Sequence, residues 1–512
     1  MTARLLLFCA VISLLACACS VPWQQASTSA PGTSDFEASI ARLGRTDPGS
    51  PAVLSAQLAY ADFLLSEAAG PCAERLERAQ EELLSVEASP KVRVMFPDGW
   101  DRATDLEYRL HLARAACGGT DGDNELRTAV AAARRAVELY REAFDYRSMV
   151  IKQSDVGTVL HRLGDNAAAL AAIETALEMD REYGFEDEAR ENYKLLLTWR
   201  GESAGDAQTA LLMEDFPQRR AVLQFGWRPG DARITLESHR ECVDGGQIAA
   251  SRAAATFERR VGADKDGGWS VSYTDRLSRY EPGVWPTMTQ GSEIPQMVFP
   301  PAAPPAVDFK VSATGEFEGV TDSTAFAVRL AAETEELIRA AAPSGDRSRS
   351  LIGAAFEATT ATFSAEMLEA ATAENYQLET AMWIGATLEQ GVWYETSGPL
   401  SLPGMPRVVV QHRIEFAFTR LVPCTAGAAE PTCVEMVIRA TPDEEALEQV
   451  IDDVGLVAYT ESTEARIVTD PATLLPYARE ERLYWYASAG EGRQDFVLES
   501  EHLVSTTSYG AD

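Results

Sequence analysis

The sequence has little of what metal and nucleotide chemistry needs. Its five histidines are scattered over 512 residues, and no CxxC pair occurs, so we expect no metal site. The Walker motif, the dinucleotide glycine fingerprint and HExxH are all missing, which leaves no pattern for a phosphate cofactor or a catalytic zinc. No apolar run beyond residue 20 reaches the roughly 20 residues that a membrane-spanning helix takes. We therefore expect no cofactor, and a body attached to a membrane only through its N-terminus.

Positive charge is also scarce. Lys and Arg number 45 against 78 Asp and Glu, which gives a formal net charge of −33. Such a charge repels phosphate backbones and argues against nucleic-acid binding. Hydrophobic residues make up 46% of the chain, a normal share for a globular protein, and 512 residues exceed what one core usually holds. Two or three folded domains are expected.

Residues 1–19 have the form of an export signal. One arginine precedes an apolar run over residues 5–15 that is too short to span a membrane. The run ends in Leu14-Leu15-Ala16-Cys17, which resembles the lipobox of bacterial lipoproteins. That resemblance implies that Cys17 is the lipidated residue. It also implies the outer membrane, facing the periplasm, because Ala18 stands where Asp commonly retains such proteins in the inner membrane.

Two alternatives to lipidation at Cys17 remain open at this point. Cys19 offers a second register for the lipobox, and an ordinary signal peptide could be cut near Ala18 or Ser20. Residues 20–34, SVPWQQASTSAPGTS, contain little to bury and are expected to form a flexible tether. A lipidated cysteine, a spacer and a folded body together predict a surface-anchored protein.

Residues 35 to about 205 are rich in Ala, Leu, Glu and Arg at helical spacing. The connections are short and carry glycine or proline, which break helices. We predict helices over residues 53–69, 73–88, 102–117, 125–143, 148–163, 167–181 and 186–199.

One predicted helix pair, Val150 to Tyr183, has small and apolar residues at a regular spacing. They are Gly157, Leu160, Gly164, Ala169, Ile173 and Ala176. The pattern resembles the tetratricopeptide repeat, in which small residues let two helices approach closely, although Gln153 and Arg181 stand where the family has Trp and Pro. A second copy precedes it around Ala129–Val137, and a looser pair lies at 53–88. Three repeats suffice for a stable array; the alternative is an irregular helical bundle.

The character of the chain changes in the second half, residues 215–512. Apolar and polar residues alternate in runs such as Arg407–Phe418, Cys433–Ile438 and Leu483–Tyr486, which is typical of half-buried antiparallel strands. Apolar residues at helical spacing interrupt the strands from about 322 to 383. The expected fold class is α + (α+β), a helical-hairpin array followed by an antiparallel-sheet domain with a helical insert. The strands before and after the insert belong either to one sheet or to a duplicated pair.

Four cysteines are candidates for disulfides in an oxidising compartment. Cys424 and Cys433 flank a loop between two predicted strands, so we expect them to close a hairpin. Cys72 and Cys117 each lie beside a helix-breaking glycine, so we expect them to join neighbouring helices. Cys242 has no evident partner.

Six tryptophans of the second half are candidates for the lining of a pocket. They are Trp227, Trp269, Trp285, Trp383, Trp393 and Trp485. The alternative is that they pack on the faces of the sheet, as buried aromatic residues commonly do.

No catalytic residue is predicted. One literal GxSxG motif occurs, Gly201-Glu-Ser203-Ala-Gly205, but a nucleophile elbow needs a strand that turns sharply into a helix. The residues before Gly201 have the pattern of a helix end, so we interpret the motif as a linker. The acids of residues 120–125, TDGDNE, lack the further ligands that calcium needs and are interpreted as a polar turn.

Three functional hypotheses follow. The first is a non-enzymatic envelope lipoprotein, because the resemblance to tetratricopeptide repeats implies a concave face that binds an envelope protein partner. The second is a carrier of a lipid or small apolar ligand that uses the sheet domain. The third is a cell-wall hydrolase with an unrecognised site, which predicts carboxylates of shifted pKa in one cleft.

Overall fold

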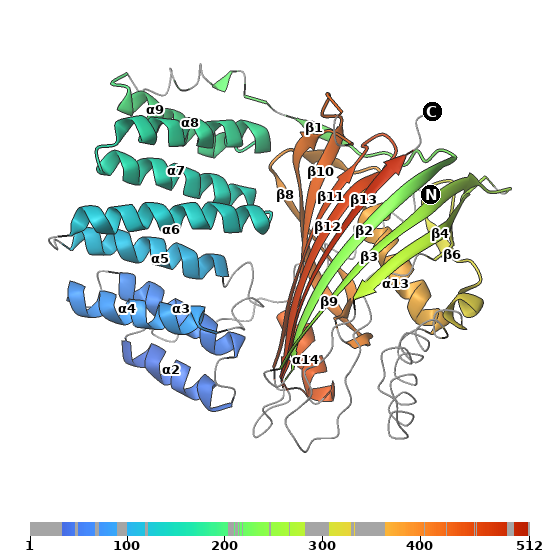
Figure 1. The fold of residues 1–512 in the computed structure, drawn as a ribbon, viewed down its shortest axis with the longest axis horizontal. Coiled ribbons are helices and arrows are strands. Elements are labelled where there is room, and N and C mark those ends of the chain that lie inside the picture. The colour runs from blue at the N-terminus through green and yellow to red at the C-terminus, as the bar shows by residue number, and fades with distance from the viewer. Residues whose placement is uncertain are drawn as a thin grey trace, which may run out of the picture.

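In the computed structural model, a stack of helices is followed by a large antiparallel sheet (Figure 1), which confirms the expected fold class. The description covers residues 33–509 except for 47–49, 67–70, 90–99, 118–120, 203–208, 210–212, 215, 218, 245–246, 266, 282–306, 329–331, 333–363, 404, 426–427, 455, 457 and 489–495. The predicted signal, most of the predicted tether and Cys17 lie outside the described residues.

The helical array contains every helix predicted from periodicity, with ends shifted by a few residues. Its members are α2 (Thr33–Thr46), α3 (Pro51–Leu65), α4 (Cys72–Glu87), α5 (Trp100–Ala116), α6 (Gly122–Glu142), α7 (Tyr146–Arg162), α8 (Asn166–Tyr183) and α9 (Glu186–Trp199). Helix α2 was not predicted. Only its Phe36 and Ile40 pack against the core of α3 to α5, too few apolar positions to stand out as a helical period.

Local sequence sets the ends of α7 and α8. Asp145 and Asp165 cap these helices, because their side chains accept hydrogen bonds from the backbone N–H groups of Ser148 and Ala168 at 3.1 and 3.2 Å. Helix α8 ends at Gly184, whose φ of 80° lies in the left-handed region that favours glycine.

The residues of the repeat pattern lie where α7 and α8 pack together. A Cβ on Gly157 would lie 2.9 Å from Cγ1 of Ile173 and 3.2 Å from the carbonyl oxygen of Ala169, so this close approach requires glycine. Gly157 itself is buried, and the other buried members of the pattern are Leu160, Ala169, Ile173 and Ala176. Gly164 lies in the turn between the helices, where its φ is 79°.

The sheet has 11 strands in the order β6-β5-β4-β3-β2-β13-β12-β11-β10-β9-β8, and each neighbouring pair is antiparallel. Its strands are β2 (Gly230–Asp244), β3 (Gln247–Ala263), β4 (Trp269–Glu281), β5 (Phe309–Val311), β6 (Phe317–Val320), β8 (Trp393–Leu402), β9 (Met405–Val422), β10 (Cys433–Pro442), β11 (Ala458–Thr469), β12 (Pro476–Ser488) and β13 (Phe496–Tyr509). Strand β13 pairs with both β2 and β12. The strands before and after the insert therefore share one sheet.

The two faces of the sheet have different neighbours, because successive residues of a strand point to opposite sides. On β10, Met436 and Ile438 pack with Trp383 in one core. We call this side the inner face. Val437 points the other way and packs with residues of α6, α7 and α8, and we call that side the outer face.

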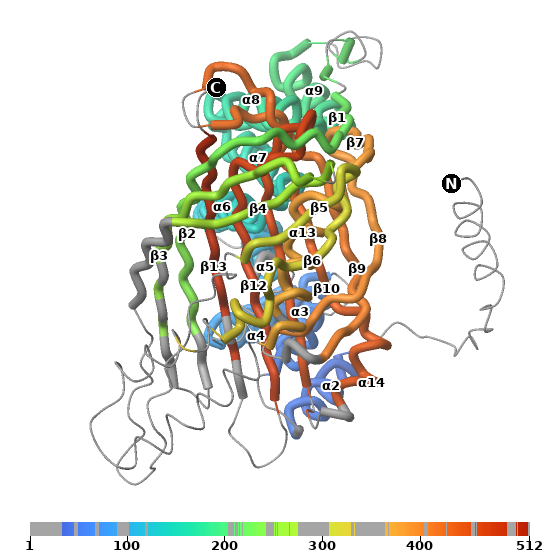
Figure 2. The backbone as a smooth tube through the Cα atoms, turned by 90° about the vertical axis from the view of Figure 1, so that its right-hand side faces the viewer, coloured from blue at the N-terminus to red at the C-terminus, as the bar shows by residue number. Residues whose placement is uncertain are grey.

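Helices and a small sheet cover the inner face (Figures 1 and 2). They are α13 (Ala365–Glu379), the 3-10 helix η3 (Ala381–Trp383), α14 (Glu444–Val454) and the pair β1 (Arg220–Val222) and β7 (Thr387–Glu389). Strands β5 and β6 pack against α13. The hydroxyl of Tyr376 in α13 donates a hydrogen bond of 2.9 Å to the carbonyl of Gly315, in the turn between these strands. Helix α13 and η3 end the predicted insert, of which residues 333–363 lie outside the described residues. Helix α14 was not predicted.

The outer face packs against one edge of the array. Gln390, beside β7, donates from Nε2 to the carbonyl of Thr419 at 3.0 Å and also to the carbonyl of Glu182 in α8. A Cβ on Gly391 would lie 2.9 Å from the carbonyl oxygen of Tyr183, so two backbones meet here without room for a side chain. Within the described residues, no helix has the length and apolar character that a membrane span needs.

Candidate functional site

A cavity lies between α13 and the inner face of the sheet. The sheet side of its wall comes from β2, β3, β4, β5, β12 and β13. Its volume is about 120 Å³, and a cavity of roughly 150 Å³ holds a benzene molecule. Ala371 of α13 lines the cavity and is exposed to solvent, so the cavity opens at the surface beside this helix.

Most of the cavity wall is apolar. The rings of Trp227 and Tyr376 meet edge to face with centroids 5.8 Å apart, and those of Phe257 and Tyr273 meet in the same way at 5.5 Å. The aliphatic part of the lining is Ile234, Leu236, Val307 and Leu503. Such a wall favours a ligand with an apolar body, because binding removes that body from water.

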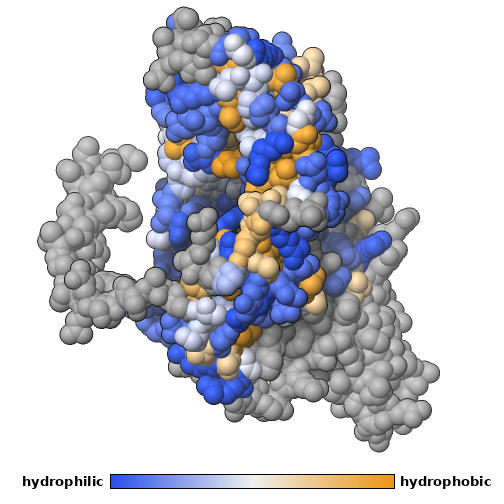
Figure 3. All heavy atoms as spheres, turned by 90° about the vertical axis from the view of Figure 1, so that its left-hand side faces the viewer, coloured by the Kyte–Doolittle hydropathy of each residue, from blue (hydrophilic) through white to orange (hydrophobic). Residues whose placement is uncertain are grey.

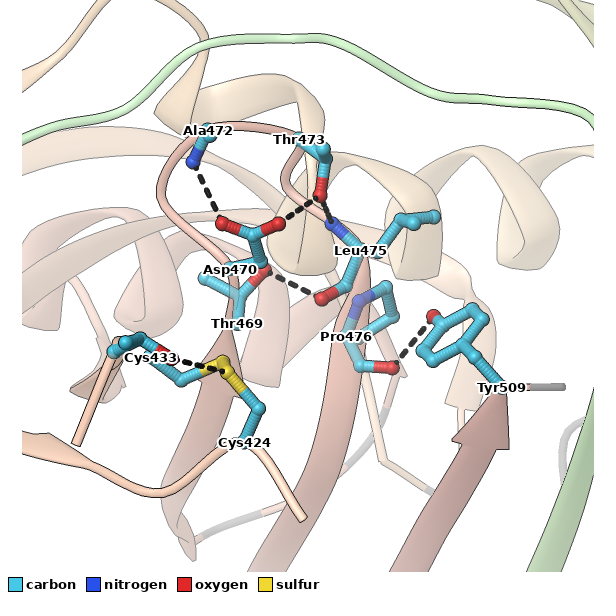
Figure 4. Close-up of a disulfide and its surroundings, with 10 residues drawn as sticks. Cys424, Cys433, Thr469, Asp470, Ala472, Thr473, Leu475, Pro476 and Tyr509 are labelled. Atoms are coloured by element: carbon cyan, nitrogen blue, oxygen red, sulfur yellow. Dashed lines mark hydrogen bonds between the residues drawn. A yellow bond between two sulfur atoms is a disulfide. The ribbon is translucent and has the colours of Figure 1, made fainter. Parts of the chain in front are cut away.

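Arg259 of β3 is a buried cation in this wall. It is 7% exposed, and its Nη2 donates to the hydroxyl of Tyr509. Tyr509 donates its own proton to the carbonyl of Pro476 at 2.9 Å (Figure 4). Burial raises the pKa of Tyr509, and that of Tyr273, to about 12, so both phenols are neutral at pH 7. In the described part of the chain, Arg259 forms no ion pair and its Nε has no hydrogen-bond partner.

Arg479 of β12 is a second buried cation in the lining, and it is paired. It is also 7% exposed. Its Nη1 donates to Glu379 at 2.7 Å and to Asn375 at 3.2 Å, and its Nη2 donates to Glu481. Because Glu379 and Asn375 belong to α13, Arg479 ties this helix to the sheet.

A group of buried acids lies near the cavity without lining it. Burial, together with the charge of Glu481, raises the pKa of Glu374 to about 7. His412 and Glu461 share a hydrogen bond of 2.9 Å. Burial alone would lower the pKa of His412, but Glu461 outweighs it and raises that pKa. Glu374 is not part of the cavity wall, and the described residues hold no group of three or more potential metal ligands.

A second hollow, of about 480 Å³, lies between the array and the outer face of the sheet. Several arginines line it, and acids already neutralise them. Glu435 is fully buried and accepts hydrogen bonds of 3.1 Å from both Arg420 and Arg466. Glu480 pairs with Arg466 at 3.1 Å and with Arg482 at 3.0 Å. We interpret this hollow as a polar seam that holds the array against the sheet.

Both expected disulfides are present. Cys424–Cys433 closes the loop of the β9–β10 hairpin, from just after β9 to the first residue of β10 (Figure 4). Cys72–Cys117 joins the start of α4 to the region after α5. In the GxSxG stretch, Gly201 lies two residues after the end of α9 at Trp199, so a helix and not a strand precedes the motif. Ser203 lies outside the described residues.

The tryptophans proposed to line a pocket lie in separate places. Trp227 lines the cavity, and Trp269 is half-buried in the same apolar cluster. Trp383 and Trp485 pack in other parts of the inner-face core. Trp393 packs on the outer face. Trp285 lies outside the described residues. The five described tryptophans therefore do not surround one pocket.

Sequence reasoning missed the two buried arginines, although a signal for one of them was present. In β3 the buried positions Ala255, Phe257, Arg259 and Val261 alternate with more exposed ones. An arginine at an apolar position of a strand indicates a buried cation that needs a partner. That partner cannot be identified from the sequence, because it comes from other strands or from a ligand.

Comparisons with known proteins do not give a family. No protein-family model and no curated protein matches the chain. A solved structure described as "Lipid-protein interactions in lipovitellin" matches with a TM-score of 0.27 and 10% identity, covering 56% of this chain and 26% of that one. The chain thus spans about a quarter of that protein's length, and a likeness at this TM-score carries no argument about fold or function.

Proposed function

We propose that the protein is a carrier that binds a small molecule with an apolar body in the cavity between α13 and the inner face of the sheet. The observation that supports this is the chemistry of the wall, which is mostly aromatic and aliphatic, with a few convergent polar groups. This combination is typical of ligand sites. A ligand would enter beside α13, where the cavity opens at the surface.

One pair of variants tests the proposal. Ser505 of β13 lines the cavity, whereas the next residue, Thr506, is exposed and points to the other face of the sheet. We expect Ser505→Phe to fill the cavity and Thr506→Phe to leave it open.

Benzoate and benzamide serve as probes in ligand-detected NMR on the full chain. The proposal predicts that at least one probe binds the wild type and Thr506→Phe, and that Ser505→Phe no longer binds it. Equal binding to all three proteins, or no binding of either probe to the wild type, would contradict the proposal.

The helical array is a second candidate site of function, as a surface for an envelope protein partner. Among the described residues, the core shared with the sheet contains residues from the edge of the array formed by α6, α7 and α8, and the core of α3 to α5 contains no sheet residue. Figure 3 shows the side turned away from the sheet, where apolar side chains gather among hydrophilic ones. Ile151 of α7 is 43% exposed.

A photo-crosslinking residue at position 151 in the native envelope tests this second candidate. A scaffold function is supported if one partner protein is crosslinked in stoichiometric amount, is displaced by an excess of untagged wild-type chain, and is not displaced by untagged Ile151→Asp. If crosslinks are absent, or if a crosslinking residue at exposed Glu191 of α9 captures the same proteins, the array has no specific partner at this surface.

We also propose that the chain is exported and anchored through Cys17. The two disulfides support export, because such bonds persist in oxidising compartments.

A further inference from the structure

We infer that the ligand of this cavity is a small amphiphilic monocarboxylate whose carboxylate is bound by Arg259. The inference rests on the proposed function, and it adds the chemical class of the ligand and the residue that recognises it.

The contacts of Arg259 support the inference first. A guanidinium has five N–H donors in a planar fork that matches the two oxygens of a carboxylate. At Arg259 a neutral phenol, Tyr509, accepts from Nη2, and Nε has no partner in the described part of the chain. A buried charge without a counter-ion is strongly unfavourable. Arg259 therefore offers donors and a positive charge at the cavity wall.

Arg479 provides an internal comparison. The two arginines line the same cavity and are equally buried, at 7% exposure each. The chain supplies two carboxylates to Arg479, from Glu379 and Glu481. Among the described residues no carboxylate forms an ion pair with Arg259, and Glu379, already paired with Arg479, acts on it only through its charge. A ligand carboxylate would give Arg259 the kind of partner that Arg479 receives from the protein.

Charge and size restrict the ligand further. Arg479 and its two glutamates together carry a charge of −1, so Arg259 is the cation of the lining that can balance a ligand anion, and a second negative charge on the ligand would have no partner there. This favours a monoanion over a phosphate of higher charge. A volume of about 120 Å³ limits the enclosed apolar body to a single aromatic ring or a short acyl chain, since roughly 150 Å³ holds benzene.

Benzoate and benzamide test the inference, because they have the same shape and differ in charge. Their dissociation constants are measured by titration calorimetry on the full chain, in a buffer without carboxylates. We expect the wild type to bind benzoate at least tenfold more tightly than benzamide, since charge-assisted hydrogen bonds are stronger than neutral ones. In Arg259→Met that ratio should fall close to one while benzamide still binds, and Arg259→Lys should keep part of the preference.

The outcomes separate this inference from the proposed function. If the wild type binds both probes equally, or if Arg259→Met keeps the preference for benzoate, the carboxylate assignment is wrong and the cavity remains a ligand site. If neither probe binds, or if Ser505→Phe binds both like the wild type, the proposed function and the inference fail together. Retained benzamide binding and an unchanged circular-dichroism spectrum show that Arg259→Met is folded.

Discussion

Glu480 of β12 lies in the polar seam between the sheet and the array, and replacing it with glutamine should destabilise the protein in a pH-dependent way. Its carboxylate shares a hydrogen bond of 2.9 Å with His502 and pairs with Arg482 at 3.0 Å and Arg466 at 3.1 Å. The hydrogen bond to His502, followed by the charges of Arg482 and Arg466, lowers the pKa of Glu480 from 4.5 to about 2.

The size of the effect follows from the two pKa values. Each pKa unit corresponds to about 1.4 kcal/mol, so ionised Glu480 contributes roughly 3 kcal/mol to the free energy of unfolding. The side chain is 16% exposed, so solvent screening is limited. Because folding lowers this pKa, the contribution is fully present above pH 4.5 and is lost as the pH falls toward 2. We expect Glu480→Gln to cost roughly 3 kcal/mol at pH 7 and about 1 kcal/mol at pH 3.

Urea unfolding at pH 7, 5 and 3 measures these losses, since the difference between variant and wild type cancels the titration of other groups. Glu191→Gln is the control, because Glu191 of α9 is 70% exposed and pairs only with Lys194 among the described residues. Its effect should stay below about 0.5 kcal/mol at every pH. A loss at Glu480 that is the same at pH 7 and pH 3, or that is under about 1 kcal/mol at pH 7, would refute the reasoning.

Three further outcomes are expected. Gly157→Ala and Gly44→Ala both gain helix propensity, but only the new Cβ at position 157 would collide with Ile173. In urea unfolding, Gly157→Ala should therefore be less stable than Gly44→Ala by about 1–3 kcal/mol. Equal stabilities would mean that α7 and α8 do not pack closely at this glycine. Replacing Cys72 and Cys117 by serine removes a disulfide that spans 45 residues, whereas the hairpin disulfide Cys424–Cys433 spans 9. By chain entropy, the first replacement should lower the free energy of unfolding by roughly 4 kcal/mol and removal of the hairpin disulfide by roughly 3 kcal/mol. A larger loss from the hairpin disulfide would exclude chain entropy as the cause. Cys17→Ser should abolish labelling by radioactive palmitate and release the protein from membranes, and labelling that persists would place the lipid elsewhere.

The helical half could be predicted from sequence because its signals are local. Apolar residues at helical spacing, glycines in the turns and capping residues such as Asp145 and Asp165 act within a few positions of each other. The close packing at Gly157 was found because a small residue recurs in a known repeat pattern. Helix α2 escaped notice, since only two of its side chains reach the core.

The sheet was predicted in part. Strands with β-branched and aromatic residues, such as β9 and β10, were expected where they occur. Strand β3 was not, because its sequence SRAAATFERR is rich in alanine, which favours helices in isolation, and pairing with β2 and β4 overrides that preference. Whether the strands before and after the insert share one sheet depends on β13, the last strand of the chain, and long-range pairing of this kind leaves no local signal.

The candidate site lay beyond the sequence for the same reason. Six tryptophans were proposed for a pocket, yet Trp227 is the described one that lines the cavity, because the other four described tryptophans pack where their own strand or turn places them. The polar groups of the cavity, Arg259 and Arg479, come from strands far apart in the sequence. Their shared burial and unequal pairing are visible only when β3, β12 and α13 are assembled.

The central claim is that a small molecule binds between α13 and the inner face of the sheet. A crystal of the full chain soaked with 4-bromobenzoate tests it most directly, because the anomalous signal of bromine locates the compound without prior assumptions. The account predicts a bromine peak among the aromatic rings around Trp227 and Tyr376, with the carboxylate density next to Arg259. A bromine peak only at other places, from a compound that binds the protein in solution, would contradict the account.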